Sequence, residues 1–110
     1  MVKQLSEEQV EEVYNIVEVA RATGKIRKGV NEATKSIERG IAQLVIYAKD
    51  ASPSEIILHL GPLSDDKGVV CVEVPSKEEL GTAAGLQIAT AAVVVIDAGE
   101  AQDKLKALAP

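Results

Sequence analysis

The spacing of hydrophobic and polar residues predicts a helix in the first quarter of the chain. Apolar residues recur there every three or four positions, and glutamates occupy most of the opposite face. Ser6 precedes this run and Gln9 lies three positions further on, which is the arrangement of a capping box. The helix should therefore begin after Ser6 and end near Gly24. Its buried face would be formed by Val10, Val13, Val17 and Ala20.

Three short runs rich in Val, Ile and Ala have the composition of β-strands instead. They cover residues 43–49, 69–74 and 91–96. Before the first of them, Asn31 is a candidate N-cap for a helix that stops at Gly40. The residues between the first two helices, 25–29, are interpreted as a short basic linker.

Helix signals also lie between and after the later strands. Ser52 and Pro53 predict a helix start, followed by an interruption at Gly61-Pro62 and an end before Gly68. A second capped segment predicts a short helix over residues 77–85, and the last helix is expected over residues 100–108. Strands that alternate with helices indicate an α/β fold. We expect a single-domain three-layer α/β/α sandwich with a small mixed four-stranded sheet.

The core of this sandwich must be built without large aromatic side chains. The sequence has no Phe, no Trp and two Tyr, so Val, Ile, Leu and Ala must fill the interior. A chain of 110 residues can bury such a core without disulfides or a structural metal. The single cysteine excludes an internal disulfide and a thiolate zinc cluster, and it fits a reducing compartment. The first residues are polar and acidic, and no run approaches the roughly 20 apolar residues that cross a bilayer, so a cytoplasmic protein is expected.

An enzyme is not expected from the polar residues. His59 is the sole histidine and would lie within a helix between apolar residues, where a packed or surface role is more usual than catalysis. Cys71 lies within a predicted strand, where a free cysteine usually behaves as a small buried apolar residue. The sequence also lacks a phosphate-binding loop, a nucleophile elbow and a zinc-protease motif. We predict neither catalysis, cofactor nor metal; a hydrolase that uses Cys71 or His59 is the weakest alternative.

One basic segment stands out in an acidic chain. The net charge is −5, which by itself argues against nucleic acid, but residues 24–40 have five cations and two carboxylates. Three of the cations lie in a glycine-bracketed turn that leads into a helix N-terminus, and such an end favours phosphate. Asn31 and Glu32 at the tip could pair with base edges, and Lys35 lies one turn further on. From the residues alone, RNA binding and a solvated capped helix remain equally open.

The order of several motifs resembles a known family. They are Gly24-Lys25-Ile26-Arg27-Lys28-Gly29, Asn31-Glu32 with Lys35, Glu38-Arg39-Gly40, Pro53-Ser54-Glu55-Ile56-Ile57-Leu58-His59-Leu60, Val74-Pro75-Ser76-Lys77-Glu78-Glu79-Leu80-Gly81 and Ala84-Gly85-Leu86. Together they resemble the kink-turn RNA-binding family of the archaeal large-subunit ribosomal protein L7Ae. The similarity covers nearly the whole chain, which implies one kink-turn RNA-binding domain over residues 1–110.

The resemblance implies a mechanism of RNA recognition. A kink-turn is an RNA duplex bent at a three-nucleotide bulge that is followed by tandem sheared G·A pairs. In the family, the residues that match Asn31, Glu32 and Lys35 contact the guanines of those pairs, and a carboxylate suits the amino and imino protons of guanine. Further implied RNA-binding residues are Lys25, Lys28, Gly29, Arg39 and Lys77, with Arg27 as a possible addition.

A second implied contact is an apolar loop, Leu86-Gln87-Ile88, that packs on an extruded base, with Ile56 contributing to the same pocket. Core packing of Leu86 and Ile88 is the alternative. The loop lacks the proline that the family often has there, and Val30 replaces a residue that is usually Thr or Ala.

Implied partners are kink-turns in ribosomal RNA, the guide RNAs of box C/D and H/ACA particles, RNase P RNA in tRNA processing, and partner proteins of the guide particles. We expect a monomer before RNA binding. The rival function is a protein-interaction scaffold of the same fold whose RNA surface has decayed.

Overall fold

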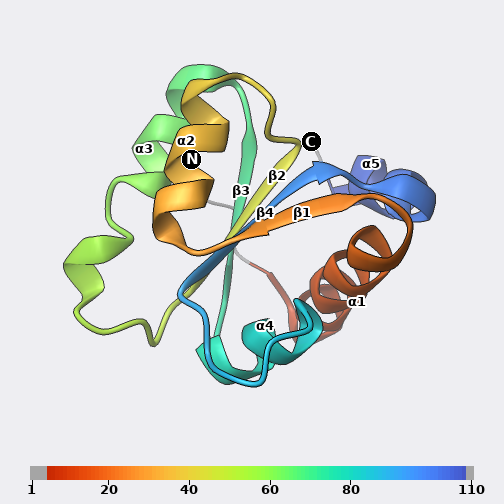
Figure 1. Ribbon diagram of the computed structural model, residues 1–110, viewed down its shortest axis with the longest axis horizontal. Helices are drawn as coiled ribbons and strands as arrows, with labels where there is room; N and C mark the ends of the chain where they lie inside the picture. Colours follow the sequence, from red (N-terminus) through yellow and green to blue (C-terminus); the bar gives the residue numbers. More distant parts are fainter. Residues whose placement is uncertain (1–4, 109–110) are drawn as a thin grey trace.

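The computed structural model describes residues 5–108, and Figure 1 shows how the elements are arranged. The α-helices are α1 (Glu7–Thr23), α2 (Val30–Glu38), α3 (Leu60–Lys67), α4 (Lys77–Ala83) and α5 (Gln102–Leu108). Two short 3₁₀ helices, η1 (Ser54–Ile56) and η2 (Gly99–Ala101), precede α3 and α5. The strands are β1 (Lys25–Lys28), β2 (Leu44–Ala48), β3 (Val70–Val74) and β4 (Ala92–Asp97).

The four strands form one mixed sheet in the order β1-β4-β2-β3. β2 and β3 are parallel, with Val45 opposite Cys71, and β4 is antiparallel to both β1 and β2. Helices α2 and α3 cover one face of this sheet, and α1, α4 and α5 cover the other. The predicted three-layer α/β/α architecture with a mixed four-stranded sheet is therefore confirmed.

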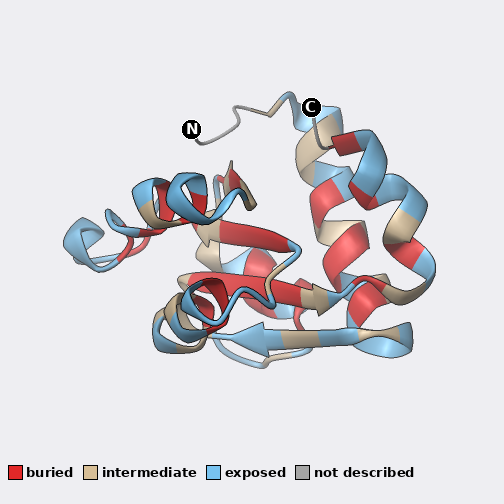
Figure 2. Cartoon of the chain, turned by 90° about the horizontal axis from the view of Figure 1, so that it is seen from above, coloured by how far each residue is buried: buried red, intermediate tan, exposed pale blue. Residues whose placement is uncertain are grey.

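Side chains that alternate along the strands divide the core into two clusters. Ile46, Val93 and Val95 face α1, α4 and α5, whereas Val45 and Val94 face α2 and α3. Figure 2 shows buried residues along strands β2, β3 and β4 and on the inner sides of the helices, whereas β1 is mostly exposed. Every fully buried large side chain is aliphatic, as the composition requires. Within residues 5–108, none of the helices has the length and apolar character needed to cross a bilayer.

The predicted basic linker is wrong, because residues 25–28 form strand β1. This strand pairs antiparallel with β4, with Arg27 opposite Val94 and Lys28 opposite Val93. Only Ile26 is half-buried, packed against the α1 side of the core. Charged side chains are common on edge strands, where they discourage pairing with other chains, so the polar composition concealed the strand.

The helix predicted after Pro53 begins later than the capping signals indicate. Residues 54–56 form η1, and α3 starts only at Leu60. Pro62 is then the third residue of α3, where a backbone N–H needs no partner within the helix, so the predicted interruption at Gly61-Pro62 does not occur. His59 therefore lies at the N-cap of α3 and is exposed, rather than in the middle of a helix.

Candidate nucleic-acid interface

The tip of α2 is built by a glycine turn at the end of β1. Gly29 has φ +99°, a left-handed conformation that side chains disfavour, and its N–H donates to Ala92 O at 2.8 Å. Gly29, and not the predicted Asn31, is the N-cap of α2, and no side chain caps this end. Because Asn31 is not used as a cap, its exposed amide is available to a ligand.

An open cleft of about 840 Å³ lies against this helix tip. It is lined by residues from the end of β1, from the first turns of α2, and from the segment that contains η1. These residues are Lys28, Gly29, Val30, Asn31, Glu32, Lys35, Glu55, Ile56 and His59. The structure thus brings five of the predicted RNA-binding residues of the basic segment to one concave surface.

The two charged residues predicted to read guanines already lie close together. Lys35 Nζ is 3.9 Å from Glu32 Oε1, and their side chains are 56% and 46% exposed. Ion pairs with this exposure contribute little free energy, so each group can exchange its partner for a ligand at small cost. The cleft therefore presents a hydrogen-bond acceptor and a cation side by side.

Three lining residues were not among the predicted site residues, and Val30 at the start of α2 is one of them. Glu55 and His59 enter the cleft from the η1 segment, and His59 Nε2 lies 2.7 Å from Thr34 Oγ1 on α2. The sequence offered no direct signal for this contact, because it depends on how α2 packs beside α3. Ile56 also lines this cleft and is 37% exposed, and its contribution to the pocket of the apolar loop at residues 86–88 stays a prediction.

The apolar loop follows α4 and is held against that helix. Gly85 turns the chain with φ +81°, and the N–H of Thr90 donates to Lys77 O at 3.1 Å. An added Cβ at Gly81 would lie 2.2 Å from Ile88 O, so the loop backbone packs directly on the glycine surface of α4. Lys77, one of the predicted RNA-binding residues, therefore lies beside this loop, because its backbone carbonyl accepts the hydrogen bond from Thr90.

The two apolar side chains of the loop, Leu86 and Ile88, differ in their exposure to solvent. Ile88 is 75% exposed, which contradicts the core-packing alternative for this residue. Leu86 is half-buried and packs against the core cluster under α1 and α4. Gln87 between them is exposed. In this loop Leu86 packs on the core, and Ile88 projects outward as an apolar surface.

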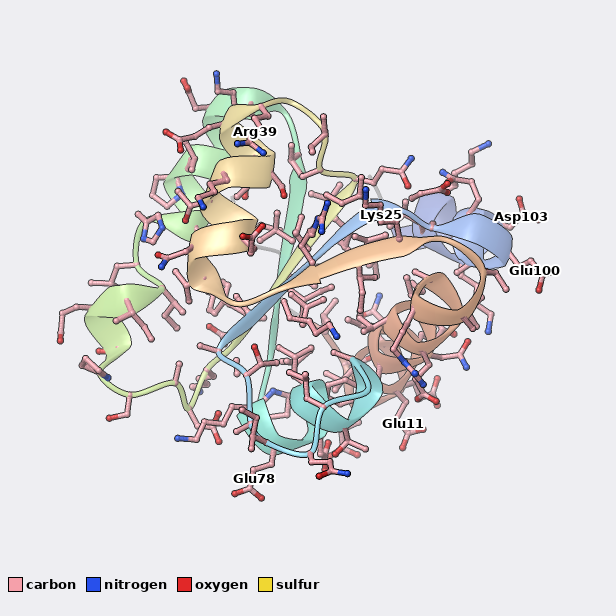
Figure 3. All side chains as sticks on the ribbon, viewed as in Figure 1. Glu11, Lys25, Arg39, Glu78, Glu100 and Asp103 are labelled. Carbon is pink, nitrogen blue, oxygen red and sulfur yellow. The ribbon has the colours of Figure 1, made fainter. Side chains whose placement is uncertain are left out.

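Two predicted cations lie away from the cleft. Figure 3 shows Arg39 at the end of α2 opposite to the cleft and Lys25 at the start of β1. Arg39, the C-cap of α2, lies eight positions after Asn31, which amounts to roughly 12 Å along the helix axis. Arg39 and Lys25 therefore flank the concave site, and their RNA contacts stay predictions.

Of the two residues considered for catalysis, His59 lines the cleft and Cys71 does not. Cys71 is buried in β3, and burial raises the pKa of its thiol to about 11. It behaves as the predicted small apolar core residue. Across residues 5–108, no three His, Cys, Asp or Glu side chains come together in a way that could hold a metal ion.

Known proteins are similar to this chain in sequence and in structure. The sequence model of the ribosomal protein L7Ae/L30e/S12e/Gadd45 family matches residues 11–105. The large ribosomal subunit protein eL8 of Haloquadratum walsbyi is 50% identical over 91 residues, which are 83% of this chain and 76% of that protein. A solved structure, the Giardia lamblia 15.5kD RNA binding protein, matches with a TM-score of 0.88 and 37% identity, over 97% of this chain and 88% of that one.

Proposed function

The chain belongs to the ribosomal protein L7Ae/L30e/S12e/Gadd45 family, and we propose that it binds RNA by recognising kink-turns. Membership of this family of ribosomal proteins also identifies the chain as non-catalytic, as the sequence predicts. The names of the two similar proteins, a large-subunit ribosomal protein and an RNA binding protein, support an RNA ligand.

The observation on which the proposal rests is the shared cleft at the tip of α2. Asn31, Glu32 and Lys35 line it together, next to the glycine turn and the free backbone amides of the helix N-terminus. A carboxylate accepts the imino and amino protons of guanine, and a lysine donates to guanine acceptors or phosphate. The positive end of the helix dipole adds a preference for phosphate, which offsets the acidic charge of the whole chain.

The loop after α4 would form the second half of the interface. An extruded base needs a flat apolar surface, and Ile88 is exposed for such a contact while Leu86 is anchored in the core. Lys77, at the start of α4, would neutralise a nearby phosphate. Lys25 and Lys28 would hold the RNA backbone beside the kink.

Recognition of this kind stabilises a bent RNA by mass action. RNA that samples straight and kinked forms shifts toward the kinked form when the protein binds that form more tightly. We propose ribosomal RNA, the guide RNAs of box C/D and H/ACA particles, and RNase P RNA as targets. Partner proteins of the guide particles would then bind to a surface made by one copy of this protein and the bent RNA together.

A titration with fluorescently labelled kink-turn RNA tests this function. The control RNA has the same length and bulge, with both G·A pairs changed to G·C. We expect the control to bind about a hundredfold more weakly, since each lost base-edge contact costs roughly 1–3 kcal/mol. Equal affinities, or no binding of either RNA, would contradict the proposal and favour the protein-interaction scaffold.

A further inference from the structure

His59 lies in the cleft in a position to bind the RNA. It comes from the segment between η1 and α3, whereas Asn31 and Glu32 come from α2, yet all three line the same surface. We propose that His59 contacts a phosphate of the RNA backbone and makes the RNA affinity depend on pH. This inference rests on the proposed RNA-binding function and adds a residue and a regulatory property to it.

The hydrogen-bonding groups around Thr34 can hold the His59 ring with both of its nitrogens protonated. Thr34 Oγ1 donates its single proton to Val30 O at 2.8 Å. With the hydroxyl proton on that bond, the imidazole nitrogen Nε2, 2.7 Å from the same oxygen, can donate its own proton to Thr34. The other nitrogen, Nδ1, has no hydrogen-bond partner among residues 5–108.

This arrangement accommodates the ring in its charged form. In the cationic ring both nitrogens donate, so Nε2–H can bind Thr34 while Nδ1–H remains for a second acceptor. His59 is exposed, so solvent and ligand can both reach it. A donor with a positive charge is what a phosphate oxygen binds most strongly.

The charged side chains around His59 cancel one another, so one added proton changes the net charge of the cleft. The cleft lining contributes Lys28 from β1, Glu32 and Lys35 from α2, and Glu55 from the η1 segment. Two cations and two carboxylates give a formal charge of zero when His59 is neutral. Protonation of His59 gives the cleft a net positive charge, and the attraction for a polyanion should then increase.

The experiment compares the intact protein with two variants at about pH 5.5 and about pH 8. His59→Gln keeps an N–H donor for Thr34 but cannot take up a proton. Leu58→Gln is the matched control, because Leu58 is 68% exposed and lines a different pocket beside Tyr47 and Glu73. Each protein is titrated with kink-turn RNA and with the G·C control RNA.

We expect the parent and Leu58→Gln to gain about fivefold more affinity on acidification than His59→Gln, the effect of one unit charge about 4 Å from a phosphate in water. Effects of pH on the RNA are common to all three proteins and cancel in this comparison. If all three show the same ratio of affinities while still preferring the kink-turn, the role of His59 is wrong and the proposed function stands. If no protein prefers the kink-turn at either pH, both proposals fail.

Discussion

Removal of the Glu32 carboxylate should cost the protein little stability and much of its RNA specificity. The side chain is 46% exposed and its ion pair with Lys35 spans 3.9 Å, so the pair stabilises the helix by about 0.2–0.5 kcal/mol. A carboxylate in the first turn also interacts favourably with the helix dipole, by roughly 0.3–1 kcal/mol. Alanine has the higher helix propensity, which offsets part of this loss. Glu32→Ala should therefore lower the free energy of unfolding by at most about 1 kcal/mol.

The loss in RNA binding should be larger than the loss in stability. A base-edge contact to guanine is worth about 1–3 kcal/mol, so Glu32→Ala should weaken kink-turn binding roughly 5- to 150-fold. The G·C control RNA should lose much less, so the preference between the two RNAs should narrow. Fluorescence titrations measure both affinities, and thermal unfolding of the same samples measures stability.

The chain offers a matched control for this substitution on the same helix. Glu38 is the last residue of α2 and is exposed at the end away from the cleft. Glu38→Ala removes the same charge, so the two variants have the same net charge and differ in where the carboxylate was lost. We expect Glu38→Ala to retain the preference for the kink-turn. If Glu32→Ala binds the kink-turn as tightly as the parent, or if both variants lose the same affinity, the role of Glu32 in base recognition is refuted.

Three further predictions concern other parts of the molecule. Lys25→Ala should lower the affinity for all RNAs alike and reduce the slope of log affinity against log salt concentration by about 0.9, because an exposed lysine binds phosphate. A loss of affinity confined to kink-turn RNA would contradict this prediction. Gly81→Ala should weaken kink-turn binding by displacing the loop, since the new Cβ would lie 2.2 Å from Ile88 O; NMR shift changes absent from residues 85–90 would count against it. Cys71 should resist iodoacetamide in the native protein, and the free energy of unfolding should fall as pH rises from 9.0 to about 11, because the unfolded thiol loses its proton first. Rapid native labelling, or higher stability over that pH range, would show that the thiol is not protected.

Local signals in the sequence identified the helices and strands that depend on their nearest neighbours. The Ser6 box forms as predicted, with the N–H of Gln9 donating to Ser6 Oγ at 3.2 Å and the N–H of Ser6 donating to Gln9 Oε1 at 2.9 Å. Ser76 likewise caps α4, and Gly85 follows it in a left-handed conformation. These features require only three or four consecutive residues, so the sequence contains all the information that they need.

The start of η1 and α3 shows where such local signals mislead. Ser52, Pro53 and Glu55 have the types and spacing of a helix start, yet residues 54–56 form only a 3₁₀ turn. Isolated helical turns are marginal, and the packing of their apolar residues decides which of them extend. Leu60, fully buried against the sheet, begins the longer helix.

The chemistry of the helix tip could be predicted because Asn31, Glu32 and Lys35 lie within one and a half turns of a single helix. The amino-acid sequence by itself thus determined the α/β layers, the aliphatic core and the polar groups at the start of α2. Only the tertiary structure decided that residues 25–28 become an edge strand, that Ile88 packs on Gly81, and that His59 reaches Thr34. Each of these features depends on residues that come into contact only when the chain folds. Strand β1, for example, pairs with a strand about 70 positions further along the chain. A local sequence pattern cannot specify such a contact, because the partner residues lie outside it.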